Sequence, residues 1–196
     1  MLDQSLMFDS KKIEKLIRTY QTGTDWTIPG GASAERIVEY EQELGFTFPD
    51  DLKAWVMFTN GPKIVGRFDH YFGVPGALAG AFGEMYRLIP NWRENHWIPI
   101  AGDSCGCYCA MATRQEFGDG FPIIYFDIDK GFDDPICIEA SDLQHFLERQ
   151  IEIAQMIHTK GIASWYEPNV AARKKRILEE DPAIVNFHGA PYRWEV

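Results

Sequence analysis

Three cysteines alternate along one short segment, in which Cys105, Cys107 and Cys109 form a Cys-x-Cys-x-Cys pattern. Alternate residues of a β-strand point to the same face, so a strand here would gather three thiols that could bind a soft metal as thiolates. Structural zinc sites more often use Cys-x2-Cys pairs, and the sequence has no second pair or nearby histidine cluster. Cys137 could join them only through the tertiary fold. We therefore favour free cysteines lining an apolar strand face, and expect no metal and no cofactor.

Acidic residues are concentrated between Glu116 and Asp142, where eight acids stand against one base, Lys130, so that this segment carries −7 of the formal net charge of −10. Its segment FDIDKGFDD contains four aspartates, at Asp127, Asp129, Asp133 and Asp134. A calcium loop needs ligands at alternating positions and a final bidentate glutamate, which are missing. Two interpretations stay open: a solvated turn between strands, or an acidic patch that faces a basic protein.

The sequence lacks several common motifs of enzymes. A cysteine nucleophile needs a histidine base within reach, and the five histidines are scattered with no motif that brings one near a cysteine. The sequence has no phosphate-binding glycine loop, no His-Glu-x-x-His, no Gly-x-Ser-x-Gly and no dinucleotide fingerprint. An enzyme with a cysteine or acidic site is therefore the least favoured class of function.

The elements that would position these residues begin with helices. Ser33 is a good N-cap, apolar residues follow at helical spacing as far as Leu44, and Gly45 ends this helix. Pro49 suits the first position of a second helix, which Asn60-Gly61-Pro62 ends. Further helices are predicted over residues 10–21, 84–92, 143–160 and 169–180, the third of these capped by Ser141 or Asp142.

Strands are predicted between these helices, over residues 63–74, 97–101, 107–112, 122–127 and 136–138. The order of helices, strands and helices predicts an α+β fold. We expect a single domain with a mostly antiparallel (mixed) central sheet flanked by helices, which pack to one side.

The order of these signals resembles the SUKH superfamily, the bacterial immunity proteins and fungal cell-wall regulators of the Smi–Knr type. The first block of the family consists of a helix with a glutamate, Leu-Gly, an apolar residue before a proline, a second helix and Asn-Gly. Its counterparts here are Glu41, Leu44-Gly45, Phe48-Pro49 and Asn60-Gly61. Phe48 replaces a leucine typical of the family. A second block, Trp-x-Pro-(Ile/Leu)-Ala-x-Asp-x-x-Gly, has counterparts in Trp97, Pro99, Ile100, Ala101, Asp103 and Gly106. The resemblance covers residues 26–146.

The resemblance implies a structural role for these motif residues. Glu41 lies on the apolar face of its helix, where a carboxylate must be paired or hydrogen-bonded. We expect it to accept hydrogen bonds from backbone N–H groups in the loop of residues 26–31. We expect a SUKH-like domain over residues 1–160, followed by a helical extension over residues 161–196 that packs on this core or reaches for a partner.

The function that the resemblance implies is non-enzymatic protein binding, by an immunity protein that neutralises a toxin. Toxins paired with this family are often nucleases, whose basic grooves would match an acidic face. We expect Asp129, Asp133 and Asp134 to contribute to that face, with Trp26 or Trp194 as an exposed anchor. The alternative is an intracellular scaffold or regulator of the Smi–Knr type.

The charge and hydropathy of the chain restrict its partners. A net charge of −10 argues against general nucleic-acid binding, which uses cations to neutralise phosphates, and against an anionic membrane surface. No run of about 18 apolar residues occurs, and the N-terminus does not resemble a secretory signal. We therefore expect a cytoplasmic protein with a protein partner, no nucleic acid and no membrane.

Overall fold

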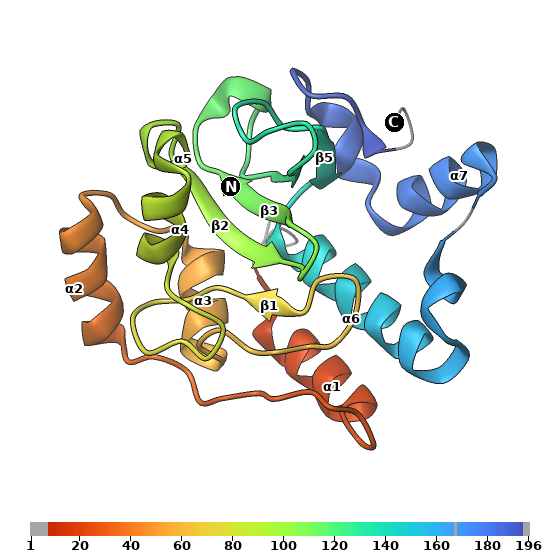
Figure 1. Ribbon diagram of the computed structural model, residues 1–196, viewed down its shortest axis with the longest axis horizontal. Coiled ribbons are helices and arrows are strands. Elements are labelled where there is room, and N and C mark those ends of the chain that lie inside the picture. Colours follow the sequence, from red (N-terminus) through yellow and green to blue (C-terminus); the bar gives the residue numbers. More distant parts are fainter. Residues whose placement is uncertain (1–7, 167, 194–196) are drawn as a thin grey trace, which may run out of the picture.

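The computed structural model describes residues 8–166 and 168–193. Figure 1 shows the path of the chain, with α2 and α7 near opposite ends of the long axis. The helices are α1 Ser10–Tyr20, α2 Ala34–Leu44, α3 Asp50–Phe58, α4 Phe82–Leu88, α5 Pro90–Glu94, α6 Leu143–Lys160 and α7 Val170–Glu180. Four helices are capped by side chains that accept a backbone N–H, as favoured at N-termini: Asp9, Ser33, Asp142 and Asn169.

Five strands form one sheet in the order of the chain, and every neighbouring pair is antiparallel. The strands are β1 His70–Tyr71, β2 Trp97–Gly102, β3 Cys107–Ala112, β4 Ile123–Asp127 and β5 Cys137–Ala140. Short 3₁₀ helices are η2 Gln115–Phe117, η3 Ile162–Trp165 and η4 Pro182–Asn186. The predicted α+β fold with a mainly antiparallel sheet is confirmed.

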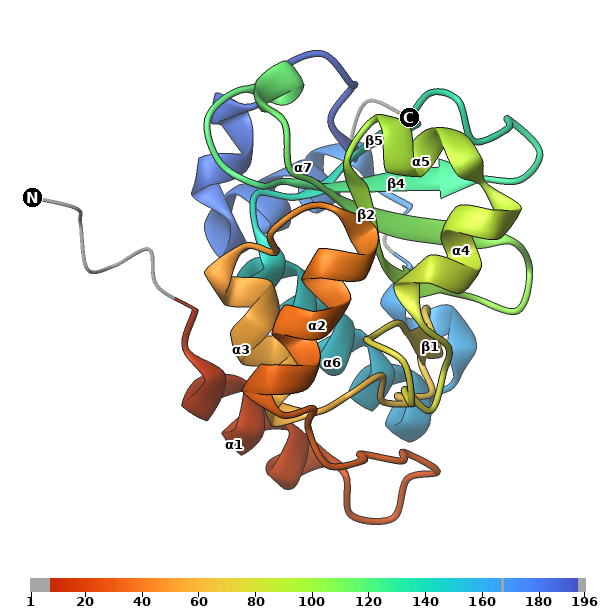
Figure 2. The same cartoon turned by 90° about the vertical axis from the view of Figure 1, so that its left-hand side faces the viewer.

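The sheet is covered on both faces, so the prediction of helices on one side was wrong. Neighbouring residues of a strand point to opposite faces, and Phe126 of β4 packs against Trp92 of α5 at a ring distance of 4.6 Å. Tyr125 contacts Phe68 on the other face, and Phe68 in turn contacts Phe146 of α6. α6 also packs with α1 and α3, and Figure 2 shows α4 and α5 beside the sheet, apart from these three helices.

Two boundaries differ from the sequence prediction. The predicted helix over residues 84–92 is two helices, because Pro90 disfavours helical backbone at Ile89 and starts α5 instead. The predicted strand over residues 63–74 shrinks to the two residues of β1, while Lys63 pairs in isolation with Thr27. Apolar residues in this stretch are buried in the core without forming a continuous strand.

The segment after α6 contributes side chains to the same hydrophobic core. Its buried apolar residues are Ile177, Ile184, Phe187 and Ala190. The backbone N–H of Ile138 in β5 donates to the Pro191 carbonyl at 3.0 Å, so this segment also lies along the edge of the sheet. None of the helices in the described part of the chain is both long and apolar enough to span a bilayer.

Candidate functional site

Residues 127–134, which include four aspartates, form a turn between β4 and β5 that is fixed by several hydrogen bonds. Asp127 Oδ1 accepts a hydrogen bond from the N–H of Asp129 at 2.9 Å. The Phe132 carbonyl accepts from Asn91 Nδ2 and from Trp92 Nε1, each at 3.1 Å, which ties the turn to α5. The turn exposes the three carboxylates that were predicted to meet a partner: Asp129, Asp133 and Asp134. All three belong to one turn whose backbone is held in place, and Asp133 Oδ1 also accepts a hydrogen bond from Asn91 Nδ2 at 3.0 Å.

The acidic surface is smaller than the sequence count implies. Glu139, one of the eight acids of that segment, is 0% exposed and paired with arginines. Asp142 caps α6 by accepting the N–H of His145 at 2.8 Å. Within residues 116–142, the exposed negative charge is therefore concentrated in the β4–β5 turn and at Glu116 and Asp119.

Trp26, which was predicted as an exposed anchor, is 6% exposed and belongs to the hydrophobic core. The neighbouring Thr27 exchanges two backbone hydrogen bonds with Lys63, at 2.8 and 2.9 Å, which hold this loop against the core. The prediction was wrong because the polar residues around Trp26 face solvent while its ring turns inward. Trp194, the other tryptophan considered, lies outside the described residues.

Glu41 accepts a backbone hydrogen bond, but the donor does not lie in the loop that was predicted. Its Oε1 accepts the backbone N–H of Phe48 at 2.6 Å and lies 3.1 Å from Lys53 Nζ, and the side chain is 11% exposed. The carboxylate therefore joins the end of α2 to the beginning of α3. The prediction of a backbone N–H partner was right in kind, and its placement in residues 26–31 was wrong.

The other residues of the first motif also shape the backbone. Gly45 ends α2 with φ of 83°, and Pro49 precedes α3 as its N-cap. Asn60 is 8% exposed: its Oδ1 accepts the N–H of Val74 at 3.0 Å and its Nδ2 donates to the Val74 carbonyl at 3.3 Å. Gly61 has φ of 69°, and a Cβ there would lie 2.9 Å from the Tyr71 carbonyl oxygen. Leu44 packs in the core.

The second motif organises β2 and the β2–β3 turn. Trp97 Nε1 donates to Glu116 Oε1 at 2.8 Å, and Pro99 sits at the irregularity where β2 shifts register against β3. Asp103 Oδ1 accepts the N–H groups of Cys105 and Cys107, each at 2.8 Å, inside a turn that Gly106 closes with φ of 94°.

Two of the three cysteines share one face of β3, as predicted, since Cys107 and Cys109 alternate within the strand, and Cys105 lies outside it. Cys105 is exposed in the turn before β3, whereas Cys107 is half-buried and Cys109 is fully buried within β3. Burial raises the pKa of both Cys107 and Cys109, so neither thiol is activated. Among the residues that the structure describes, no three histidine, cysteine or acidic side chains are placed to hold a metal ion.

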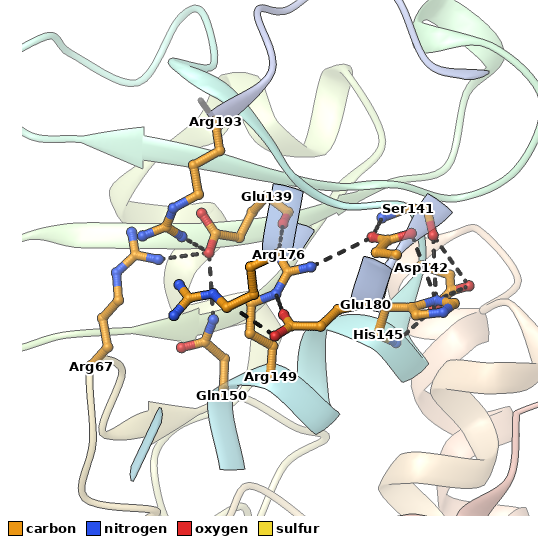
Figure 3. Close-up of polar contacts among 11 residues, drawn as sticks. Arg67, Glu139, Ser141, Asp142, His145, Arg149, Gln150, Arg176, Glu180 and Arg193 are labelled. Carbon is orange, nitrogen blue, oxygen red and sulfur yellow. Dashed lines mark hydrogen bonds and ion pairs between the residues drawn. The ribbon is translucent and has the colours of Figure 1, made fainter. Parts of the chain in front are cut away.

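A buried ionic network surrounds Glu139 (Figure 3). Its Oε1 lies 2.6 Å from Arg67 Nη1, pairs also with Arg193, and is 3.5 Å from Gln150 Nε2. Arg149 Nη1 donates to the Glu139 backbone carbonyl at 2.8 Å. A carboxylate removed from water stays charged only when cations and donors surround it. The network therefore joins β5 and α6 to two segments far away in the chain.

The network continues through Arg149 towards the end of α7. Arg149 Nε lies 3.3 Å from Glu180 Oε2, and Asp181, which is 0% exposed, accepts the N–H of Ser141 at 2.7 Å. His145 Nδ1 is 2.9 Å from Asp142, and this contact raises the pKa of His145 although burial opposes it.

This cluster of Ser141, Asp142 and His145 is not a hydrolytic triad. A triad places serine at one imidazole nitrogen and the acid at the other, so that the ring can pass a proton between them. Here the Ser141 hydroxyl, at 3.4 Å, and the Asp142 carboxylate, at 2.9 Å, both lie at Nδ1. The geometry supports a cap on α6 and not a proton relay.

Sequence reasoning missed the Glu139 network. It counted Glu139 with the acidic surface, although this glutamate lies inside the apolar strand sequence CIEA. Arg149 and Gln150 likewise lie among the apolar positions of α6 and are buried there. A charge within an apolar strand, together with charges on the apolar face of a helix, was the signal that could have indicated a buried ion pair.

The sequence model of the SMI1/KNR4 family (SUKH-1) matches residues 31–149, which is more than half of the chain. The chain belongs to the SMI1/KNR4 family. Members of this family are generally non-catalytic. No curated protein matches the chain as a relative. The family match confirms the predicted resemblance to the SUKH superfamily.

The SUKH-1 match runs from just before α2 into α6, so it contains both motifs and the whole acidic turn. Trp26 lies outside it. The Glu139 network crosses its boundary, because Glu180, Asp181 and Arg193 follow the matched residues. Side chains from the segment after α6 thus contact the buried network of the SUKH-1 domain.

Proposed function

We propose that this SUKH-1 domain is a non-enzymatic protein-binding domain, an immunity protein that neutralises a cognate toxin by binding it through the β4–β5 turn. The observation that carries the proposal is the set of exposed carboxylates of Asp129, Asp133 and Asp134 on a turn fixed to α5. Carboxylates on a fixed backbone lose little conformational freedom when they meet a basic surface. They also speed encounter with a basic partner at low salt.

The partner class follows from the charge of the turn and from the family. Toxins paired with proteins of this family are often nucleases, and a nuclease groove that holds phosphates is basic. The turn contains one base, Lys130, among its aspartates. A partner that presents several lysines or arginines would therefore be complementary to it.

The experiment is capture of the partner, followed by charge reversal. The protein serves as bait in cells that express the genes beside its own, and the captured toxin domain is titrated by calorimetry at low and moderate salt. Asp129→Lys, Asp133→Lys and Asp134→Lys are combined in one variant. We expect affinity to fall at least about a hundredfold, since close charge pairs at interfaces are worth several kcal/mol.

A matched control reverses three exposed carboxylates elsewhere: Glu39 and Glu43 on α2 and Glu179 on α7, whose side chains are 56–65% exposed. This variant has the same net charge and should keep most of the affinity. Equal loss in both variants would show that only the total charge matters, and equal retention would remove the turn from the interface. Capture of cellular proteins and no toxin would favour a scaffold or regulator of the Smi–Knr type.

A further inference from the structure

Two turns meet at one end of the sheet. The β2–β3 turn of residues 103–106 lies at the same end as the β4–β5 turn, because β2 and β4 both run antiparallel to β3 and therefore point the same way. The backbones of the two turns contact each other directly, since the N–H of Ile128 donates to the Gly106 carbonyl at 3.2 Å. The two turns therefore form one continuous surface.

Ile128 lies where the two turns meet, and it is 55% exposed. Its carbonyl accepts the N–H of Gly131 at 3.2 Å. Its side chain rests against Gly106, where an added Cβ would lie 3.0 Å from Ile128 Cγ2, whereas a Cβ on Gly131 would meet no atom within 4 Å. The isoleucine is thus supported from one turn and open to solvent. Single exposed apolar residues are common on protein surfaces, so the surroundings of Ile128 decide what it can do.

Carboxylates flank this isoleucine on both turns. Asp127 and Asp129 precede and follow it in the chain, and the β2–β3 turn adds Asp103. Their hydrogen bonds come from backbone N–H groups, which do not cancel a negative charge: Asp103 Oδ1 accepts those of Cys105 and Cys107, and Asp127 Oδ1 accepts that of Asp129. An apolar side chain among carboxylates is complementary to an apolar pocket that is bordered by lysines or arginines.

We propose that Ile128 is the apolar anchor of the partner-binding surface, and that this surface extends from the β4–β5 turn across the β2–β3 turn to Cys105, a step that rests on the function proposed above. The partner would then present an apolar pocket within a basic surface, and not a uniformly basic groove. Binding energy is concentrated in a few side chains that lose their water near the centre of an interface. Ile128 takes the role that the sequence prediction gave to Trp26, while the aspartates speed encounter.

Ile128→Ser tests the anchor without a change in net charge. The probe is the toxin domain encoded beside the protein's own gene, with its affinity and rates measured by surface plasmon resonance at low and moderate salt. We expect affinity to fall at least about thirtyfold through faster dissociation, as for a hot spot. The association rate and its salt dependence should stay as in the wild type, because the carboxylates remain.

Ile162→Ser is the matched control, because Ile162 in η3 is 75% exposed and the substitution is the same. It should bind the toxin domain like the wild type. Both changes affect exposed side chains and should alter stability by less than about 0.5 kcal/mol, which circular dichroism and urea unfolding check before binding is compared.

The thiol of Cys105 gives a second readout that needs no substitution. Cys105 is exposed, whereas burial raises the pKa of Cys107, Cys109 and Cys137. A maleimide should therefore react first at Cys105, and mass spectrometry of peptides locates the label. Saturating toxin domain should slow this reaction at least about tenfold if the interface covers the β2–β3 turn.

Comparison with the charge-reversed β4–β5 turn separates the anchor from the function proposed above. Weaker binding by Ile128→Ser, with Ile162→Ser unaffected and Cys105 protected, supports the anchor. If charge reversal weakens binding but Ile128→Ser binds normally, or Cys105 stays reactive in the complex, the proposed function stands and the anchored two-turn surface is wrong. If no toxin domain binds, or charge reversal has no effect, both proposals fail.

Discussion

At the scale of single residues, Glu139 carries the most demanding interaction of the fold. Its side chain is 0% exposed, and Arg67 and Arg193 meet the same carboxylate oxygen. Removing one member of a buried ionic group leaves the others charged and without compensation in a medium of low dielectric. A change at Glu139 therefore lowers stability mainly because the remaining arginines keep their buried charges without a counter-ion.

Glu139→Gln should lower the free energy of unfolding by about 3 kcal/mol, because the amide keeps the shape of the side chain but leaves the guanidinium charges unbalanced. Urea unfolding at pH 7 measures the change. Glu179→Gln is the control: Glu179 is 65% exposed and pairs with Lys175, so its loss should cost less than about 1 kcal/mol. Similar small losses in both variants would mean that the buried network contributes little.

At the scale of elements, helix ends decide where α2 and α6 stop and start. Gly45 ends α2 in the left-handed region with φ of 83°, and a Cβ there would meet no atom within 4 Å. Asp142 begins α6 by accepting the N–H of His145. The left-handed backbone at Gly45 restricts which residue can end α2. The protonation of Asp142 and His145 affects the cap at the start of α6.

Gly45→Ala should destabilise the protein by about 1–2 kcal/mol, since the left-handed region is costly for any residue with a Cβ. Gly30→Ala is the matched control, because a Cβ on Gly30 would likewise meet no atom within 4 Å, and Gly30 lacks a left-handed φ. It should be neutral or slightly stabilising. Chemical denaturation compares the two, and equal effects would remove backbone strain as the explanation for Gly45.

The Asp142–His145 contact predicts a pH dependence with a defined sign. Burial raises the pKa of Asp142, but hydrogen bonds from His145 outweigh it and the net pKa is lowered; the same contact raises the pKa of His145. The histidine contribution is complete below its unfolded pKa of about 6.5 and is lost as pH rises through the higher folded pKa. The aspartate contribution is lost at acid pH, as pH falls through its lowered folded pKa.

His145→Gln should therefore cost more stability at pH 5.5 than at pH 8.5, when urea unfolding of variant and wild type is compared at both values. His158→Gln is the control, since His158 is exposed on the same helix. It should show a smaller difference between the two pH values. A larger penalty for His145→Gln at the alkaline pH would contradict the assigned contact.

At the scale of the whole molecule, the segment after α6 and the SUKH-1 match share one core. Phe187, in this segment, is 4% exposed and belongs to the same hydrophobic cluster as residues of the sheet. Elements that share a core are expected to unfold together. We therefore expect the cooperative unit to extend beyond the residues of the family match.

Phe187→Ala should cost about 3–5 kcal/mol, as large-to-small changes in cores do. The transitions seen by circular dichroism and by tryptophan fluorescence should still coincide. Val185→Ala, two residues away at a side chain that is 53% exposed, should stay within about 0.5 kcal/mol. Separate transitions in Phe187→Ala would show instead that the segment after α6 unfolds independently.

Local signals predicted well what depends on neighbouring residues. Ser33, Gly45 and Asp142 cap the helices that their residue types indicated, and four of the five strands lie close to their predicted positions. The acidic turn was also placed correctly between two strands. These features depend on backbone preferences that a short window of sequence contains.

The errors arose where distant contacts decide. Trp26 is buried because its loop pairs with Lys63, and Glu41 binds the N–H of Phe48 and not the loop before α2. The partners of Glu139 lie 72 residues before it and 54 after it, at Arg67 and Arg193. No local window includes such pairs, so composition placed Glu139 on the surface.

The spread of the Glu139 partners also has a consequence for biosynthesis. Arg67 is made before Glu139, whereas Arg193 follows it by 54 residues. At about 5–20 residues per second, that distance corresponds to roughly 3–11 s on the ribosome. During this interval β5 would hold a carboxylate whose full set of counter-charges has not yet been synthesised. The nascent sheet should therefore keep its last strand hydrated, and accessible to chaperones, until the residues around Arg193 have left the exit tunnel.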